Sequence, residues 1–462
     1  MSHTSIDRTA LRAALAIIVG ALAVIFDTTI VSVALHPLAE TFGTDIHVIQ
    51  WVGTAYLLTL GAVIPLVGWL QSRFGAKRLW LLALTVFLAG SALCSFAWDA
   101  PSLIAFRVVQ GLGGGIMMPL MTTIIAQSTQ EEGRARLIAL VSLPAALGPI
   151  FGPVIGGLIL GFLSWHWLFL INLPLGLTGL IMAWRMLPAD TAAPSVRLDI
   201  VGLVLLSPAL VALLWSLSSL SEAGGWAQTQ VQFRLVAGLL LLVGFVVWAW
   251  RRGSRALIDL SILRSRPTWA AALLMFIMGA TLYGAMVLLP LFWQELGGNS
   301  ALQAGLLLIP QGVGALVSRM QAASLVERLG VRRLAMLGFA LAGAATLPFA
   351  LAESAEVTPL LMIALLVRGY GVGLVFIPLM TVAFSGLDRE QMPHASVLIR
   401  TSQQVGGATG VALFTIILTR LAEQTGTLEQ AYQFTFGWSI ALTACAVLVS
   451  GFLPAQGNAN RH

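Results

Sequence analysis

Residues 11–35 read LRAALAIIVGALAVIFDTTIVSVAL, an apolar stretch whose single acidic residue is Asp27. About 20 apolar residues in a helix span a bilayer, whereas the core of a signal peptide is shorter, so this stretch predicts a retained membrane helix. A carboxylate in the hydrocarbon core is costly, and an ionisable side chain there is a functional candidate. Asp27 is therefore the first candidate functional residue.

The composition extends this conclusion to the whole chain. Of its 462 residues, 58% are hydrophobic and only 10% are charged, whereas about a quarter of the residues of a soluble domain are charged. The sequence therefore predicts an integral membrane protein. Cys94 and Cys445 both lie in apolar stretches, where they are expected to fill space, because their spacing fits neither a metal site nor a disulfide framework.

Continuous apolar runs of membrane-spanning length predict about fourteen helices and an all-α fold. The expected spans are 12–36, 47–70, 77–97, 101–126, 136–160, 165–187, 200–220, 232–251, 267–293, 301–326, 331–351, 357–385, 395–421 and 433–454. The runs are continuous rather than alternating, which argues against a membrane barrel.

Basic residues predict the orientation of these helices. They gather in the even-numbered loops, at Arg73, Lys77, Arg78, Arg134, Arg136, Arg185, Arg197, Arg251, Arg252, Arg255, Arg264, Arg266, Arg328, Arg332 and Arg333. The odd-numbered loops hold Glu40, Asp45, Asp99, Glu222, Glu353 and Glu356. The positive-inside rule then places the even loops and both termini in the cytoplasm. The net charge of +6 is a topology signal, and we expect no nucleic-acid partner.

Two pairs of similar segments reveal an internal repeat. Residues 68–78 (GWLQSRFGAKR) resemble residues 323–333 (ASLVERLGVRR), and residues 119–122 (PLMT) recur at 378–381. Both matches are displaced by a little over 250 residues. Six helices occupy fewer residues than this, so additional chain is inserted between the two copies. We therefore predict a six-helix repeat over 1–187, an inserted pair of helices with linkers over 188–266, and a second repeat over 267–462. Such repeats are typical of transporters that bind substrate near the midplane.

Several motifs resemble those of a known family. The loop at 68–78 is similar to the loop signature of the major facilitator superfamily, although Ser72 stands where that signature has an acid. Residues 148–157 (GPIFGPVIGG) resemble the antiporter signature of its proton-driven exporters, and 107–111 (RVVQG) resembles its arginine motif. Residues 27–31 (DTTIV) and 165–174 (WHWLFLINLP) look like signatures of the fourteen-helix drug:proton antiporter branch.

The resemblance implies roles for three groups of residues. The antiporter motif comprises Gly148, Pro149, Gly152, Pro153, Gly156 and Gly157. Its glycines share one helical face, and the resemblance implies that it acts as a tight hinge. The cytoplasmic gating loops comprise Gly68, Arg73, Gly75, Lys77, Arg78, Glu327, Arg328, Gly330, Arg332 and Arg333. The basic loops also have a simpler interpretation, which is that they set topology. The proton-coupling pair is Asp27 and Arg107, which lie roughly 13 and 10 Å below the outer face at 1.5 Å per residue. A purely structural ion pair, or an arginine extending to the interface, is the alternative for these two residues.

Other polar residues are candidates for a polyspecific substrate cavity, with interhelical hydrogen bonding as the alternative. They are Gln110, Gln311, Arg368, Tyr56, Tyr283, Tyr370 and Asn172. Arg368, near midplane, should face a wet cavity, or else pair with Asp27 or helix carbonyls. If it faces the cavity, neutral, zwitterionic or anionic amphiphiles are expected as better substrates than permanent cations. Arg319, close to the cytoplasmic end of its helix, is expected to extend toward the interface.

The sequence thus predicts a proton-coupled antiporter that exports amphipathic drugs or toxic metabolites across a bacterial inner membrane. No phosphate-binding loop, metal cluster or nucleophile–base pair is present, which disfavours ATP-driven transport and enzymatic chemistry and predicts no cofactor or metal besides the coupling proton. The expected partners are an amphipathic small molecule, the lipid bilayer and, as a candidate, a periplasmic adaptor. Import or lipid flipping on the same scaffold, or a membrane-embedded sensor or enzyme, are the alternatives.

Overall fold

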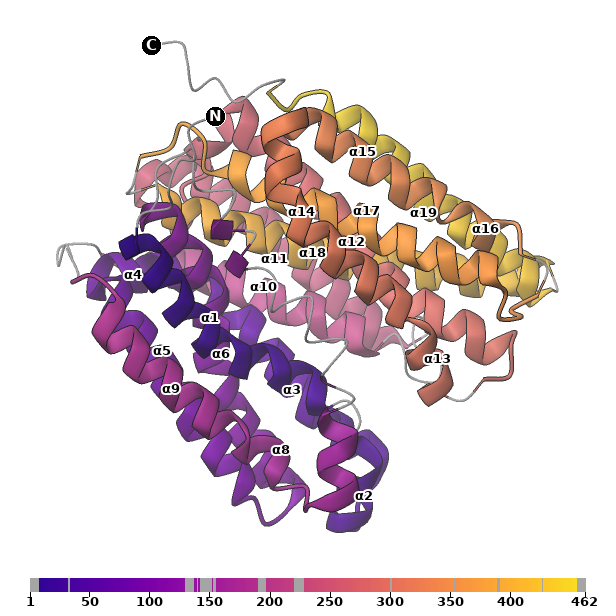
Figure 1. Ribbon diagram of the computed structural model, residues 1–462, viewed down its shortest axis with the longest axis horizontal. Helices are drawn as coiled ribbons and strands as arrows, with labels where there is room; N and C mark the ends of the chain where they lie inside the picture. Colours follow the sequence, from indigo (N-terminus) through magenta and orange to yellow (C-terminus); the bar gives the residue numbers. More distant parts are fainter. Residues whose placement is uncertain are drawn as a thin grey trace. The chain divides into compact units, whose positions relative to one another are not determined.

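The computed structural model describes residues 8–31, 34–128, 137–138, 140–141, 152, 155–189, 197–219, 228–299, 301–352, 354–388, 391–425 and 427–454. Within these ranges the secondary structure is helical and holds no strand (Figure 1). The all-α prediction is confirmed.

The helices group by their contacts into two compact units. Unit 1 comprises Met1–Trp215, Arg234–Ser261 and Leu387–Val397. Its main helices are α1 (Arg8–Ile30), α2 (Leu35–Phe42), α3 (Ile46–Val63), α4 (Val67–Phe74), α5 (Ala76–Ser95), α6 (Ala100–Ser128), α8 (Trp167–Leu170) and α9 (Asn172–Met186). It also takes most of the inserted pair, α10 (Ile200–Ser219) and α11 (Thr229–Arg252).

Unit 2 comprises Ser216–Phe233, Ile262–Gly386 and Leu398–His462. Its helices are α12 (Arg266–Glu295), α13 (Ala301–Leu307), α14 (Ile309–Leu329), α15 (Val331–Ala344), α16 (Leu347–Ala350), α17 (Pro359–Ala383), most of α18 (Met392–Thr425) and α19 (Leu428–Ser450). The units follow contacts, whereas the boundaries at 187/188 and 266/267 follow the sequence repeat, and those boundaries stay a prediction.

Eleven of the described helices are long and apolar enough to cross a membrane. Three further predicted spans account for the difference from fourteen. The span at 200–220 contains a shorter apolar helix, Ile200–Ser216, and the span at 301–326 contains α13 and α14. The span at 136–160 lies largely outside the described residues. The helices thus fall where the apolar runs predicted them.

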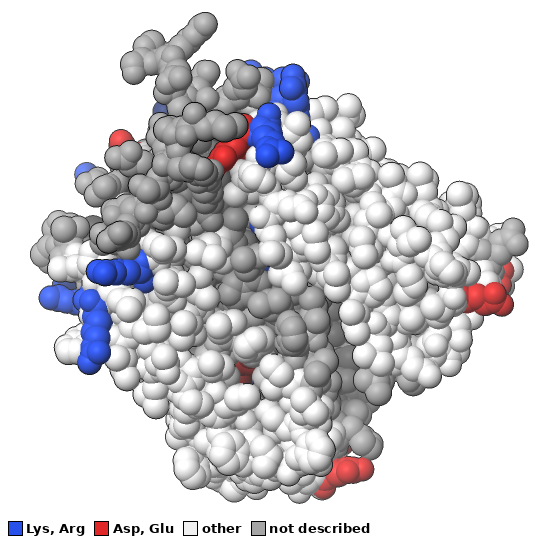
Figure 2. Space-filling model, viewed as in Figure 1, with Lys and Arg blue, Asp and Glu red and all other residues white. Residues whose placement is uncertain are grey.

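The described helices expose large apolar side chains, as a protein in lipid requires. Among the most exposed are Phe96, Trp98, Phe162, Phe233, Leu240, Trp250, Leu351 and Leu448. On the face shown in Figure 2, coloured Lys, Arg, Asp and Glu side chains lie mainly at the margins. α11 is only 17% buried within its apolar window, so most of its surface is available to lipid.

The two gating loops share one backbone conformation. Gly75, between α4 and α5, has φ 86° and ψ 163°, and Gly330, between α14 and α15, has φ 76° and ψ 160°. The N–H of Gly75 donates to the carbonyl of Gln71 (2.8 Å), and that of Gly330 donates to the carbonyl of Val326 (2.9 Å). These angles lie in a region that glycine alone occupies readily. The repeat read from the sequence is therefore also a repeat of local structure.

We expect Gly75→Ala to lower the thermal unfolding midpoint of the purified protein. A side chain at these angles costs about 1–3 kcal/mol, and Gly330→Ala should behave in the same way. Gly437→Ala is the matched control, because Gly437 lies within α19 and an added Cβ there meets nothing within 4 Å. That control should leave the midpoint unchanged or raise it. Equal midpoints for the Gly75 and Gly437 variants would contradict the strain argument.

Candidate functional site

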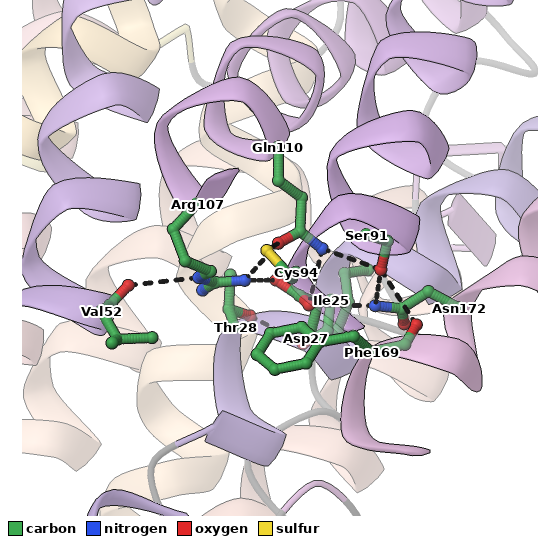
Figure 3. Close-up of polar contacts among 10 residues, drawn as sticks. All are labelled: Ile25, Asp27, Thr28, Val52, Ser91, Cys94, Arg107, Gln110, Phe169 and Asn172. Carbon is green, nitrogen blue, oxygen red and sulfur yellow. Dashed lines mark hydrogen bonds and ion pairs between the residues drawn. The ribbon is translucent and has the colours of Figure 1, made fainter. Parts of the chain in front are cut away.

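Asp27 lies near the end of α1 and is completely buried. Its carboxylate accepts hydrogen bonds from three side chains on two other helices. Arg107 Nη1 donates to Oδ2 (2.5 Å), whereas Gln110 Nε2 (2.8 Å) and Asn172 Nδ2 (2.9 Å) both donate to Oδ1. Arg107 and Gln110 come from α6 and Asn172 begins α9. The acid predicted from the first apolar stretch is therefore the centre of a buried polar cluster (Figure 3).

Arg107 is the counter-charge of this cluster and is itself only 1% exposed. Its Nε donates to the carbonyl of Val52 on α3 (3.1 Å), and Nη1 also donates to Gln110 Oε1 (2.6 Å). The guanidinium carbon lies 3.9 Å from the ring centroid of Tyr56, a cation–π geometry. Arg107 thus connects α1, α3 and α6.

A second set of contacts holds the two amide side chains in place. Ser91 Oγ on α5 accepts from Gln110 Nε2 (3.1 Å) and from Asn172 Nδ2 (2.9 Å), and donates to the carbonyl of Phe169 (2.9 Å). Cys94 Sγ donates to Gln110 Oε1 (3.7 Å). Since each amide nitrogen bonds both Ser91 and Asp27, the amide groups are oriented toward the carboxylate.

Glycines set the approach of the helices that carry these groups. A Cβ added at Gly90 of α5 would lie 2.5 Å from the backbone nitrogen of Gln110, and one added at Gly111 of α6 would lie 3.0 Å from the carbonyl oxygen of Tyr56. Real Cβ atoms essentially never approach another atom as closely as the first distance, and the second distance is tighter than most Cβ contacts. α6 therefore packs directly against α5 and α3, which brings Arg107 and Gln110 to Asp27.

The charge balance explains how such a buried site is tolerated. An isolated ion in a low-dielectric interior costs several kcal/mol, and a hydrogen-bonded counter-ion offsets that cost. Two polar atoms of the cluster, the Tyr56 hydroxyl and Asn172 Oδ1, are buried without a hydrogen-bond partner among the described residues. Protonation of Asp27 would remove the negative charge and leave Arg107 as a buried cation without its counter-ion.

The predicted cavity residues divide between this cluster and unit 2. Tyr56, Gln110 and Asn172 surround Asp27, and a contact with substrate stays a prediction for them. In unit 2, Arg368 Nη1 donates to Gln311 Oε1 (2.9 Å) and Nη2 donates to the carbonyl of Thr281 (3.0 Å). For Arg368 the sequence left three alternatives, which were a wet cavity, a pairing with Asp27 and a pairing with helix carbonyls. The contact with Thr281 is the last of these.

The two remaining tyrosine candidates also lie in unit 2. Tyr370 donates its hydroxyl to Gln321 Oε1 (2.6 Å). Tyr283 packs against Gly407 of α18, where an added Cβ would lie 2.5 Å from the ring.

The first gating loop makes contacts within unit 1. Lys77 Nζ donates to the carbonyl of Leu187 (2.8 Å), and Ser72 Oγ donates to the carbonyl of Gly68 (2.9 Å). A Cβ on Gly68 would lie 3.9 Å from the Pro393 side chain. Of the antiporter motif, Gly148, Pro149 and Pro153 lie outside the described residues, whereas Gly152 and Gly156 are buried helical residues and Gly157 is exposed. The gating and hinge roles of these residues stay predictions.

Sequence reasoning missed two kinds of residue. Ser91 and Cys94 gave no usable signal, because small polar residues are common in membrane helices. Arg400 did give one, because it is a charged residue within an apolar span, the criterion that selected Asp27 and Arg368. Its guanidinium carbon lies 5.6 Å from the ring centroid of Phe376. Arg319, expected to extend to the interface, instead lies 5.5 Å from the same centroid.

Comparison with known proteins assigns the family. The model of the Major Facilitator Superfamily matches residues 17–411. The "Multidrug resistance protein B homolog" of Mycobacterium tuberculosis is 38% identical over 395 residues, which cover 85% of this chain and 73% of that protein. The "Putative multidrug resistance protein MdtD" of Serratia proteamaculans is 29% identical over 441 residues, covering 94% of this chain and 92% of that protein.

Solved structures agree in fold. The human organic anion transporter MFSD10 superposes with a TM-score of 0.70 at 18% identity, covering 96% of this chain and 99% of that one. The proton:xylose symporter XylE superposes with a TM-score of 0.66 at 14% identity, covering 96% and 95%. At these identities the likeness concerns the fold alone.

We expect a double-mutant cycle on Asp27 and Arg107 to reveal strong coupling. Asp27→Asn or Arg107→Gln alone leaves one buried charge without its counter-ion, which costs about 3–5 kcal/mol. The double variant removes both charges and should destabilise the protein by less than the sum of the single effects. The measurement is the thermal unfolding midpoint of each purified variant. Asp99→Asn is the control, because Asp99 is exposed and lies outside the membrane spans. If the effects of the two single variants on the unfolding midpoint simply add in the double variant, the ion pair is contradicted.

Proposed function

Since the chain belongs to the Major Facilitator Superfamily, we propose that it exports amphipathic drugs or toxic metabolites across the bacterial inner membrane in exchange for protons. Membership makes it a multi-pass membrane transporter rather than an enzyme. The direction of transport, the coupling ion and the substrate class are the proposal. The names of the relatives described above support the substrate class.

The observation that carries proton coupling is the complete burial of Asp27 within donors. This carboxylate has no exposed surface and is held by Arg107, Gln110 and Asn172. A proton that arrives neutralises it and weakens its bond to Arg107. Because α1, α6 and α9 meet at this carboxylate, their packing then differs between the two protonation states. A change in relative stability of this kind shifts the population of transporter conformations.

Charge placement supports the proposed orientation. Arg73, Lys77 and Arg78 lie at the turn between α4 and α5, and Asp99 lies at the opposite end of α5. By the positive-inside rule the basic turn is cytoplasmic, with both termini on the same side. We propose protons as the coupling ion without any further cofactor, and a periplasmic adaptor as a candidate partner.

Asp27→Asn should abolish uphill transport while retaining downhill exchange. The amide mimics the protonated carboxylic acid in shape and charge, so the carrier can still move substrate but cannot release a proton. The measurement is substrate flux and internal pH in proteoliposomes, with and without a pH gradient. Undiminished uphill efflux in this variant would overturn the coupling role, and loss of both activities would indicate a structural role instead.

Gly152→Leu should eliminate transport, or make the protein leak protons, without preventing its expression. Gly152 is buried, and a large side chain on a glycine face separates packed helices. Gly161→Leu is the matched control, because Gly161 is exposed and an added Cβ meets nothing within 4 Å. If the two variants transport equally well, residue 152 is not part of a hinge.

A further inference from the structure

Two guanidinium groups from different helices of unit 2 share one aromatic ring. Phe376 of α17 is buried, and its ring centroid lies 5.5 Å from the guanidinium carbon of Arg319 on α14 and 5.6 Å from that of Arg400 on α18. Cation–π contacts within about 6 Å are favourable for each cation. They do not neutralise charge, so two positive groups lie beside one neutral ring.

All three residues lie well inside their helices. Arg319 is ten residues before Leu329, Phe376 is seven before Ala383, and Arg400 is eight after Met392. At 1.5 Å per residue these positions are roughly 10–15 Å from the helix ends. The end of α17 and the start of α18 flank one loop. α14 ends at the basic loop of the second repeat. The pair therefore lies at depth on the side proposed to face the cytoplasm.

No acidic residue lies in the middle of the described membrane helices of unit 2. The acids of those helices stand at or near helix ends: Glu295, Glu327, Glu423 and Glu429. Glu295 accepts the hydroxyl of Tyr432 (2.6 Å). By contrast, the middle of the spans carries Arg319, Arg368 and Arg400. Arg368 is buried and the other two arginines are partly buried. Like charges in such surroundings are costly unless an anion approaches them.

Arg400 has hydrogen-bond donors that lack a close acceptor among the described residues. Its Nη1 contacts Gln403 Oε1 at 3.4 Å, a long contact with a neutral group, and its Nε is buried without a hydrogen-bond partner among the described residues. Arg368 differs, because a carbonyl and an amide accept from it at 2.9–3.0 Å. The position at which an external acceptor gains most is therefore Arg400, beside Arg319.

We propose that Arg319 and Arg400 form a subsite for the acidic head of an amphipathic substrate, a carboxylate or a sulfonate. The inference rests on the proposed transport function and specifies its substrate class. An anionic oxygen accepts charge-assisted hydrogen bonds from Arg400 and lowers the repulsion between the two guanidinium groups. Phe376 fixes both groups in place. A permanent cation meets repulsion at the same position.

Binding to the purified, full-length protein tests the subsite with three probes on one aromatic core. The probes are 2-naphthoate, 2-naphthamide and 2-naphthyltrimethylammonium, and the measurement is the Kd of each by titration calorimetry at pH 7. We expect the carboxylate to bind roughly tenfold or more tightly than the amide, as a charge-assisted hydrogen bond implies. The cation should bind more weakly than the amide.

Variants assign this preference to the two arginines. Arg400→Gln and Arg319→Gln should each remove most of the preference for the carboxylate while leaving the Kd of the amide within about twofold, since the amide carries no charge. Arg400→Lys should retain part of the preference, because the charge remains. Arg420→Gln, at an exposed position of α18, is the control and should retain all of it.

The outcomes separate this inference from the proposed function. Equal binding of the carboxylate and the amide to the unmodified protein overturns the subsite, as does equal loss of both ligands in Arg400→Gln, and neither result bears on proton-driven export. If the carboxylate preference is present and depends on both arginines, the subsite stands. Failure of that same preparation to drive any substrate uphill with a pH gradient would then overturn the proposed function alone.

Discussion

A charged carboxylate inside a membrane protein must be neutralised, and that requirement organises unit 1. Asp27 contributes nothing favourable by itself, because burial of an unpaired ion costs several kcal/mol. The structure meets the cost with one cation and two amides. Arg107 and Gln110 come from α6 and Asn172 comes from α9. α6 packs so closely on α5 that a Cβ added at Gly90 would lie 2.5 Å from the backbone nitrogen of Gln110.

In the second repeat a buried charge is accommodated by different partners. The matching PLMT segments make α17 the counterpart of α6, with Arg107 twelve residues before Pro119 and Arg368 ten residues before Pro378. Arg107 meets a carboxylate, whereas Arg368 meets a backbone carbonyl and an amide. At these matching positions the first repeat therefore holds an oppositely charged pair, whereas the second holds an arginine bonded to neutral acceptors. In the proposed mechanism this difference separates the group that takes up the proton from the arginines that are proposed to bind an anion.

The sequence predicted the features that depend on the length of an apolar run and on the depth of a residue in the membrane. Apolar runs located the helices, and residue counts from helix ends placed Asp27 and Arg107 at similar depth, which the ion pair bears out. Direction around a helix was harder to predict, because membrane helices are apolar on most sides and the usual amphipathic signal is weak. The sequence named Gln110 and Asn172 as cavity candidates but did not predict that both donate hydrogen bonds to Asp27. Arg400 was overlooked although its sequence signal matched that of Arg368.

The proposed anion subsite has an energetic consequence for the proposed exchange of substrate for protons. In a one-for-one exchange, a monocation leaving while a proton enters moves no net charge, a neutral substrate moves one charge, and a monoanion moves two. Each charge that crosses contributes about 2.3 kcal/mol per 100 mV. With the cell interior negative, export of an anion is therefore driven by the membrane potential as well as by the pH gradient. A subsite that binds the anion well slows its release, and the larger driving force of this exchange offsets part of that cost. Arginines without acids in the middle of the described helices of unit 2, and the buried Asp27–Arg107 pair of unit 1, are thus consistent with the proposed export of an anion.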